Sequence, residues 1–449
     1  MMIPRFSALL SLLRRRQRPA PPRRFQRVRM FNFVFVGAAM LAIGISGDLK
    51  AEELRAVPFT PEQIKIDLDA LPQPTPDDSP SKRPKIDPVP AEATLMAPEG
   101  FKVTLYASDM KQARWLALTP DGDVLLAQSR EEKISILRDT DGDGSIDSTT
   151  TFADKSNGTN VPFGMAFVDG YFLLGNTDAV RRYPWKKGQI RLEGEGEQIT
   201  ELPGGGYNQH WTRNVIADEK GEWIYVSVGS ESNVDVEKEP RATVLRMKPD
   251  GSARTVYGSG LRNPVGLALH PKTGVLFTTV NERDRLGDDL VPDYLTHVQE
   301  GGFYGWPYTY LKPENLDPRR VKDGKSENPE LAAKTISPDL LFQAHSAALG
   351  ICFSTGDKFP AKYRNGAFVA FRGSWNRNAG TGYKIVFVPF GADGKPTGHY
   401  EDFVKGFLTD ESTPRTWGRP VDVMMHPDGS LLFTEEENGR VYRVSYEGG

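Results

Sequence analysis

Polar and basic side chains stand directly before a series of short apolar segments in this chain. In chain order they are Arg114, Asn160, His210, Arg213, Arg262, Asn263, His345 and Arg419. The planar guanidinium of arginine binds carboxylates with paired hydrogen bonds, whereas like charges held close together repel each other. If the fold brings these residues together, the sequence predicts a site for a small polyanionic ligand. The alternative is that the arginines only hold loops by pairing with acids. Such acids are Asp284, Asp288, Asp289 and Asp422.

His210 is the residue best suited to move a proton. The pKa of an unperturbed imidazole lies close to neutral pH, so histidine can act there as a general base. We therefore predict that His210 is catalytic, with a purely structural histidine as the alternative. His345 is a second candidate.

The loop from Asn281 to Leu290 is rich in carboxylates. Gly287 within it allows main-chain carbonyl groups to turn inward. Oxygen ligands of these kinds suit a hard cation such as Ca²⁺. The composition predicts either a Ca²⁺ site or a solvated loop held by salt bridges.

A second acidic run contains Asp139, Asp141, Asp143 and Asp147. These acids stand at positions one, three, five and nine of a calcium loop with Gly144 at position six, but Thr150 holds position twelve. Flanking helices are not evident. We expect a structural Ca²⁺ on these four acids, with an acidic surface turn as the alternative.

The elements that must position these residues are hairpins. One pattern recurs about every 50 to 80 residues: an apolar strand, a turn that usually resembles Pro-Asp-Gly, and a second apolar strand. The six copies span residues 115–127, 164–174, 214–226, 265–278, 349–370 and 421–433. With two further strands per copy they predict an all-β fold, a six-bladed β-propeller with four-stranded antiparallel blades. A pair of β-sandwiches is the alternative.

In a propeller the innermost strands all run in the same direction. The residues that precede them therefore meet at one end of the central channel. We expect residues 439–444 to close the ring by pairing near residues 101–105.

The composition excludes several classes of function. The chain has 449 residues and a net charge of −3, so we expect no nucleic acid partner. Its single cysteine, Cys352, excludes an intrachain disulfide and a multi-cysteine metal centre. The apolar neighbours of Cys352 predict a buried, inert thiol.

The N-terminal region is interpreted apart from the propeller. Arginines followed by an apolar run over residues 30–47 predict that residues 1–51 form an export signal or a membrane anchor. Residues 52–98 are rich in proline and predict a tether, and residues 99–449 form the propeller. The expected location is periplasmic, secreted or anchored in the inner membrane.

Several ordered motifs resemble the glucose/sorbosone dehydrogenase family. They include residues 260–267, 281–290 and 301–307. Residues 210–214 and 371–377 look closer to the L-sorbosone dehydrogenase branch. The resemblance covers about residues 95–446 and implies a quinoprotein that binds pyrroloquinoline quinone (PQQ) on a six-bladed propeller.

The resemblance also implies roles for individual residues. His210 matches the catalytic base, and Arg262 and Asn263 match residues that hold the quinone oxygens and a carboxylate. Arg262 is therefore predicted to be catalytic as well as cofactor-binding. Arg372 and Arg419 match residues that bind the PQQ carboxylates, and Arg213 and Asn160 of the predicted ring are added to this cofactor-binding set. The active-site Ca²⁺ maps onto the main chain of Arg283 and Asp284. The chain departs from the glucose enzymes at these two residues and at Val421 and Asp422.

The predicted function is a PQQ- and Ca²⁺-dependent oxidation of an aldose or a sugar aldehyde. Hydride passes to the quinone while His210 takes a proton. Because no haem-attachment motif occurs, electrons are expected to leave to a separate acceptor such as a quinone or cytochrome c. The alternatives are a Ca²⁺-dependent lactonase-like hydrolase and a non-catalytic propeller that binds an anionic glycan or a protein.

Overall fold

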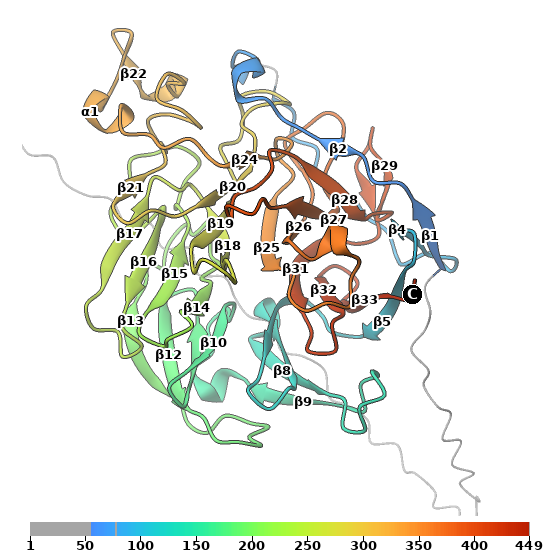
Figure 1. Cartoon of the computed structure of the whole chain (residues 1–449). Helices are drawn as coiled ribbons and strands as arrows, with labels where there is room; N and C mark the ends of the chain where they lie inside the picture. Colours follow the sequence, from blue (N-terminus) through green and yellow to red (C-terminus); the bar gives the residue numbers. More distant parts are fainter. Residues whose placement is uncertain (1–54, 77–78, 449) are drawn as a thin grey trace, which may run out of the picture. The chain divides into compact units, whose positions relative to one another are not determined.

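The computed structural model describes residues 55–76 and 79–448 (Figure 1). The predicted export signal or anchor, residues 1–51, lies outside these residues. The described residues all belong to one compact unit, Leu49–Gly449. Within them, no helix is both long and apolar enough to cross a membrane.

Six blades, each built on four antiparallel strands, follow one another around a common centre (Figure 1). The first has β6 (Ala113–Leu118), β7 (Val124–Gln128), β8 (Lys133–Arg138) and β9 (Ser148–Ala153). The second has β10 (Met165–Val168), β11 (Tyr171–Gly175), β12 (Ala179–Pro184) and β13 (Glu197–Glu201). The third has β14 (Val215–Ala217), β15 (Ile224–Val228), β16 (Thr243–Met247) and β17 (Thr255–Ser259), extended by β21 (Gly302–Phe303).

The remaining sheets complete the circle. The fourth has β18 (Pro264–Leu269), β19 (Leu276–Val280), β20 (Tyr294–His297) and β24 (Leu340–Leu341). The fifth has β25 (Ala348–Phe353), β26 (Gly366–Phe371), β27 (Lys384–Pro389) and β28 (Tyr400–Val404). The sixth has β31 (Pro420–Met425), β32 (Leu431–Glu435), β33 (Arg440–Tyr446) and β5 (Phe101–Ala107). The six-bladed propeller predicted from the hairpin repeat is confirmed.

The first strand of each blade lies innermost. β6, β10, β14, β18, β25 and β31 each contact the next one around the ring, and β31 contacts β6 again. Pairing of β33 with β5 joins the two ends of the propeller domain, with Val444 opposite Val103 and Tyr442 opposite Leu105. This is the closure expected from the sequence. It leaves the edges of the blades protected within a closed ring.

The hairpins form because short turns join strands that are apolar enough to be buried. Every residue of β7 is buried between its neighbours β6 and β8. The turn that leads into β7 is closed by the amide of Gly122, which donates to the carbonyl of Thr119. Gly122 has φ +97, a conformation that a side chain would strain.

The segment before the propeller differs from the tether expected for residues 52–98. β1 (Arg55–Phe59) pairs in parallel with β4 (Thr94–Pro98), and β2 (Gln63–Ile64) extends the fifth blade along β28. β3 (Lys85–Ile86) pairs with β30 (Arg415–Thr416), which pairs with β29 (Leu408–Asp410). The described part of this segment is therefore packed on the blades. Its proline-rich sequence suits extended edge strands, which need few apolar contacts of their own.

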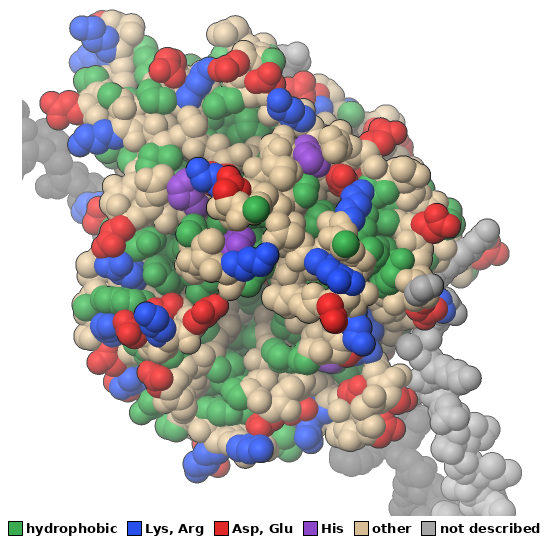
Figure 2. Space-filling model, viewed as in Figure 1, with side chains coloured by type: hydrophobic (Ala, Val, Ile, Leu, Met, Phe, Trp, Pro, Cys, Tyr) green, Lys and Arg blue, Asp and Glu red, His purple; other side chains and the backbone are tan. Residues whose placement is uncertain are grey.

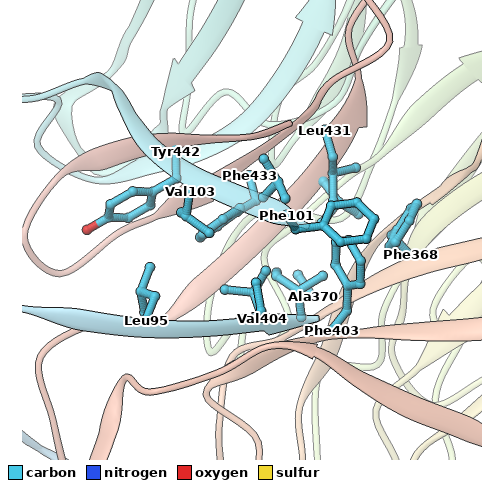
Figure 3. Close-up of a cluster of buried hydrophobic side chains, with 14 of the residues drawn as sticks. Leu95, Phe101, Val103, Phe368, Ala370, Phe403, Val404, Leu431, Phe433 and Tyr442 are labelled. Atoms are coloured by element: carbon cyan, nitrogen blue, oxygen red, sulfur yellow. The ribbon is translucent and has the colours of Figure 1, made fainter. Parts of the chain in front are cut away.

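Leu95 anchors this N-terminal segment in the apolar core. Its side chain is fully buried in the cluster that contains Phe101, Val404 and Phe433 (Figure 3). The cluster joins β4 to the fifth and sixth blades. The segment thus contributes to the core of the propeller.

Short elements decorate the loops. The 3-10 helices are η1 (Leu68–Ala70), η3 (Ser129–Glu131), η4 (Lys155–Asn157), η5 (Pro318–Arg320) and η6 (Ala361–Tyr363). An insertion after β21 carries the hairpin of β22 (Val321–Lys322) and β23 (Lys325–Ser326), and the helix α1 (Pro329–Ala332).

Candidate active site

A cavity of about 330 Å³ lies where inner strands begin. Its wall includes residues from the segments that enter the inner strands of five blades. The predicted site residues found there are Arg114, His210, Arg262, Asn263, His345, Arg372 and Arg419. The fold therefore brings most of the basic residues named from the sequence together around one space.

His210 is held in one tautomer. Its Nδ1 atom lies 2.9 Å from the carbonyl oxygen of Ser230, which can only accept a hydrogen bond. The hydroxyl of Ser230 lies 3.0 Å from the same nitrogen and donates its own proton to the carbonyl of Ser232. Nδ1 must therefore carry a proton. In the neutral imidazole the lone pair is then on Nε2.

The environment keeps this imidazole neutral. Burial, and next the positive charge of Arg262, hold the pKa of His210 well below its ordinary value. A neutral histidine with a lone pair on Nε2 in a cavity wall has the properties of a general base at neutral pH.

Arg262 is buried and has no N–H group left for a ligand. Nε donates to the carbonyl of Asn233 at 3.0 Å, and Nη1 donates to the carbonyls of Asn281 and Glu282 at 3.1 and 2.6 Å. Nη2 donates to the side chains of Asn233 and Asp284, both at 3.0 Å. These bonds use all five donors of the guanidinium. The predicted direct contact of Arg262 with a cofactor is corrected: its charge acts on the cavity while its hydrogen bonds fix the loops.

Two carboxylates hold the other arginines. Glu436 is buried and forms ion pairs with Arg114 and with Arg372. Glu437 lies 3.6 Å from Arg419 and 3.9 Å from Arg372. Burial alone would raise the pKa of Glu436, but the charges of Arg114 and Arg372 lower it to about 2. The alternative in which arginines pair with acids is thus partly realised: Asp284, one of the acids named for it, pairs with Arg262. The other arginines pair with Glu436 and Glu437, which the sequence did not single out.

Arg213 and Asn160 lie outside the wall of this cavity. Arg213 is fully buried and donates to the carbonyls of His210, Thr212 and Pro203 at 2.7, 2.8 and 2.6 Å. Asn160 is exposed and donates to Asp178 at 2.7 Å. Their predicted cofactor contacts are corrected. Arg213 positions the loop that carries His210.

The predicted main-chain ligands of an active-site Ca²⁺ accept hydrogen bonds from within the chain. The carbonyl of Arg283 accepts a hydrogen bond from the amide of Val291 at 3.4 Å. The carbonyl of Asp284 accepts from Asn233 at 3.0 Å and from the Arg283 guanidinium at 2.6 Å. The Asp284 carbonyl thus has two donors, whereas the Arg283 carbonyl has one long hydrogen bond, and the nearby guanidinium groups of Arg262 and Arg283 would weaken the binding of a cation. An active-site Ca²⁺ at these two carbonyls stays a prediction.

His345 carries the second imidazole of the cavity. Its Nε2 lies 3.0 Å from the carbonyl of Gly287, and its Nδ1 lies 3.7 Å from Asp284. Burial lowers the pKa of His345, but Asp284 raises it above its ordinary value. The pKa of His345 is therefore raised, whereas the pKa of His210 is lowered. His345 serves as a partner of Asp284.

The acidic run at residues 139–147 is an exposed loop. Oxygens of Asp139, Asp141 and Asp147 lie within 4.8 Å of one another. Asp143 stands apart from this group and accepts the amide of Ser145 at 2.7 Å. Asp139 already accepts the amides of Gly142 and Gly144. A structural Ca²⁺ at these acids stays a prediction.

Sequence reasoning missed several residues of the wall. Glu282 and Asp293 are buried carboxyls whose pKa values burial raises to about 8 and about 6. Arg130 lies over the ring of Trp211, with 4.9 Å between Cζ and the ring centroid. Arg130 follows β7, the second strand of its blade. The sequence prediction considered only residues that precede the innermost strand of a blade, so it did not include Arg130. Glu282 did stand in the acidic loop singled out from the sequence.

The protein is thus a closed propeller with a basic cavity at the end where its inner strands begin, and histidines lie in the wall of this cavity. The chain belongs to the TrAA12-like family, whose model matches residues 95–447. This match covers the propeller that the sequence predicts and excludes most of the N-terminal region.

Relatives of known name are sugar dehydrogenases. The chain is 27% identical over 374 residues to an uncharacterized protein of Borreliella burgdorferi, which covers 79% of this chain and 92% of that protein. It is 24% identical over 398 residues to a PQQ-dependent sugar dehydrogenase of Hypocrea jecorina, with 77% and 88% covered. At low identity, the chain is thus homologous to PQQ-dependent sugar dehydrogenases.

A solved structure shows the same fold. The holo form of the PQQ domain of pyranose dehydrogenase from Coprinopsis cinerea superposes with a TM-score of 0.65 at 20% identity. The match covers 80% of this chain and 98% of that domain. The sorbosone-type branch stays a prediction.

Proposed function

We propose that this protein is a PQQ-dependent dehydrogenase that oxidises an aldose or a sugar aldehyde of the sorbosone type. The observation that carries the proposal is the state of His210: a neutral imidazole with its lone pair on Nε2, in the wall of a basic cavity. The homology to PQQ-dependent sugar dehydrogenases supports it.

Groups that would hold the cofactor line the same cavity. PQQ is a planar tricarboxylate that, when bound, accepts two electrons from the substrate as hydride. Arg372 is the partly exposed arginine of the Glu436 pair, and Arg130 is exposed and has no ion pair within the described residues. Asn263 contributes a buried Oδ1 atom that has no hydrogen-bond partner in the described structure. The two guanidinium groups fit the carboxylates of such a group, whereas the acceptor oxygen of Asn263 fits an N–H donor on its edge.

His210 is proposed to take the proton of the substrate hydroxyl, which is the anomeric hydroxyl of an aldose or a hydroxyl of the hydrated sugar aldehyde. As the carbon–hydrogen bond of the substrate breaks, its electron pair leaves with the hydrogen, and the oxygen–hydrogen proton passes to Nε2 of His210. Ser230 holds the ring in place through Nδ1, and Arg262 fixes the surrounding loops. The two electrons then leave to a separate acceptor.

The pairing of the cavity's carboxylates disfavours the hydrolase alternative. A lactonase-like Ca²⁺ site needs free side-chain oxygens, but Glu436 is bound by two arginines and Asp284 by Arg262. Asp293 accepts the amides of Glu282 and Ala347 at 2.9 and 2.7 Å.

The test is reconstitution of the purified chain with PQQ, followed by dye reduction over a panel of aldoses and sugar aldehydes. We expect reduction that requires both PQQ and substrate. Omission of PQQ is the control. Hydrolysis of lactones without dye reduction, or no turnover with any sugar, would overturn the proposal.

A further inference from the structure

A second, larger cavity adjoins the first. It has a volume of about 780 Å³ and shares part of its wall with the inner cavity, including Arg372, Trp375 and Arg419. On its outer side it is lined by residues of the N-terminal segment, among them Arg83. A molecule bound in the outer cavity would therefore lie directly beside the inner one.

The N-terminal segment is fixed at this place. The amide of Lys82 donates to the carbonyl of Trp375 at 2.7 Å, and its Nζ donates to the carbonyl of Asn378 at 2.9 Å. The amide of Lys85 donates to the carbonyl of Pro414 at 2.7 Å. Arg83 lies between these two anchored residues, so its place in the wall is set by main-chain contacts.

The outer cavity carries an excess of positive charge. Its wall contains five arginines and two carboxylates, and both carboxylates are already paired. Asp284 pairs with Arg262 at 3.0 Å, and Glu437 pairs with Arg419 at 3.6 Å. Arg83, Arg285 and Arg319 line only the outer cavity, are exposed, and have no acidic partner within the described residues.

This charge is local. The net charge of the whole chain is −3, and acidic and basic side chains are interspersed around the face shown in Figure 2. Three arginines without partners around one cavity would repel one another unless an anion lies between them. A cofactor in the inner cavity would leave these three charges unmatched.

The same wall offers aromatic surface. Trp375 lines both cavities, and Tyr207 is 69% exposed at the outer one. Sugar rings pack their apolar faces on such side chains. Aromatic rings next to unpaired guanidinium groups suit a saccharide that bears carboxylates.

We propose that the outer cavity binds an acidic saccharide, a uronate-containing sugar whose carboxylate lies among Arg83, Arg285 and Arg319. The inference rests on the proposed function, since it names the substrate class of that site. The reacting end of the sugar reaches the inner cavity, and the charged remainder stays in the outer one.

The probes are digalacturonate and its methyl ester, which differ in charge and share one skeleton. Calorimetry with the PQQ-loaded chain gives both dissociation constants. We expect the acid to bind about tenfold more tightly than the ester, because exposed charge pairs each contribute a factor of about two to five. Raising the salt concentration weakens binding of the acid alone, since exposed charges are screened.

Variants assign the preference to the arginines. Each of Arg83→Gln and Arg319→Gln is expected to reduce the preference for the acid about two- to fivefold, and the triple variant with Arg285→Gln to abolish it. Lys187→Gln is the charge-matched control, because Lys187 is exposed and lies outside this wall. Thermal melting confirms that each variant is folded.

The outcomes separate the two proposals. Equal binding of acid and ester by the wild type, or a preference that survives in the triple variant, overturns the inference even if neutral aldoses reduce the dye. Competition of digalacturonate with PQQ also overturns it, because the arginines would then serve the cofactor. Tight, arginine-dependent binding of the acid without dye reduction supports the acidic ligand and overturns the dehydrogenase.

Discussion

The Nδ1 atom of His210 lies 2.9 Å from the carbonyl oxygen of Ser230, on the loop after β15. This contact decides which nitrogen of the imidazole can accept a proton. A carbonyl holds the protonated nitrogen, so the basic nitrogen is Nε2, which lies 3.4 Å from the side-chain amide nitrogen of Gln209 in the cavity wall. The position of His210 alone would not give it this role.

Replacement of His210 by asparagine tests the proton transfer. Loss of a general base lowers rates by about 10² to 10⁴, and we expect a fall of this size in kcat of dye reduction. Ser230→Ala is the matched control. It removes the hydroxyl but keeps the carbonyl, so we expect less than about a tenfold loss. A His210→Asn variant that kept most of its activity would show that another group takes the proton.

The pH dependence of activity should reflect the lowered pKa of His210. Burial and Arg262 disfavour the imidazolium, so the base stays neutral below the ordinary histidine pKa of about 6.5. The acidic limb of kcat/KM is therefore expected well below pH 6.5. The lowered pKa also makes stability depend on pH. As pH falls, His210 is protonated in the unfolded chain before it is protonated in the folded chain, so the free energy of unfolding decreases below about pH 6.5. An acidic limb centred at pH 6.5 would contradict the assignment.

Glu282→Gln should stabilise the protein at alkaline pH. Burial raises the pKa of Glu282 to about 8, whereas Arg262 opposes this shift. The folded chain holds this proton while the unfolded chain loses it above about pH 4.5, so the group destabilises the fold as pH rises through 8. Glutamine mimics the protonated carboxyl. In urea unfolding we expect little change at pH 4.5 and a gain of up to about 5 kcal/mol at pH 8.5. A loss of stability at pH 8.5 would contradict the raised pKa of Glu282, because it would mean that the fold stabilises the carboxylate.

Glu436→Gln should destabilise the fold at neutral pH. The substitution leaves the buried guanidinium of Arg114 without a counter-charge, which costs about 3 to 5 kcal/mol. Because the pKa of Glu436 is lowered to about 2, this stabilisation is present above pH 4.5 and is lost as pH falls towards 2. Glu437→Gln is the control. Its partners lie 3.6 and 3.9 Å away, so we expect under about 1 kcal/mol. Equal effects of the two variants in urea unfolding would contradict this distinction.

The fold was predictable because the hairpins are local. Each turn lies between two apolar strands that are neighbours in sequence, as Gly122 does between β6 and β7, and the blade repeat follows from counting them. The ring closure between β33 and β5 also followed, because a closed propeller must join its ends.

The partners of the arginines were not predictable. Glu436 stands after the last inner hairpin and meets Arg114 across 322 residues of sequence. No spacing rule reports such a contact. For the same reason the sequence could rank Arg262 as a ligand-binding residue but could not show that its five donors are already used. Placement at a site and availability for a ligand are separate properties, and only the first has a sequence signal.

The N-terminal segment was misjudged for a related physical reason. Its low apolar content predicts too little burial for order, yet few residues suffice when the blades already present a preformed surface. Leu95 and Ala97 enter the core from β4, and Ile66, Leu68 and Leu71 pack against a second core cluster. Main-chain hydrogen bonds and side-chain contacts such as the ion pair between Asp87 and Arg415 hold other parts of the segment. Composition indicates how much apolar surface a segment can bury within itself. This segment instead buries its apolar side chains against the propeller.

Leu95→Ala tests whether the segment is part of the fold. Removing a fully buried leucine side chain costs about 2 to 5 kcal/mol, and the site joins β4 to the fifth and sixth blades. We expect a loss of this size in urea unfolding, with one cooperative transition, because a packed segment unfolds together with the blades. Ile190→Ala is the control: Ile190 is 44% exposed, so its change should stay under about 1 kcal/mol. If the two variants were equally stable, the segment would be a free tether, as its composition predicts. In that case Arg83 would also lose its fixed place in the outer cavity.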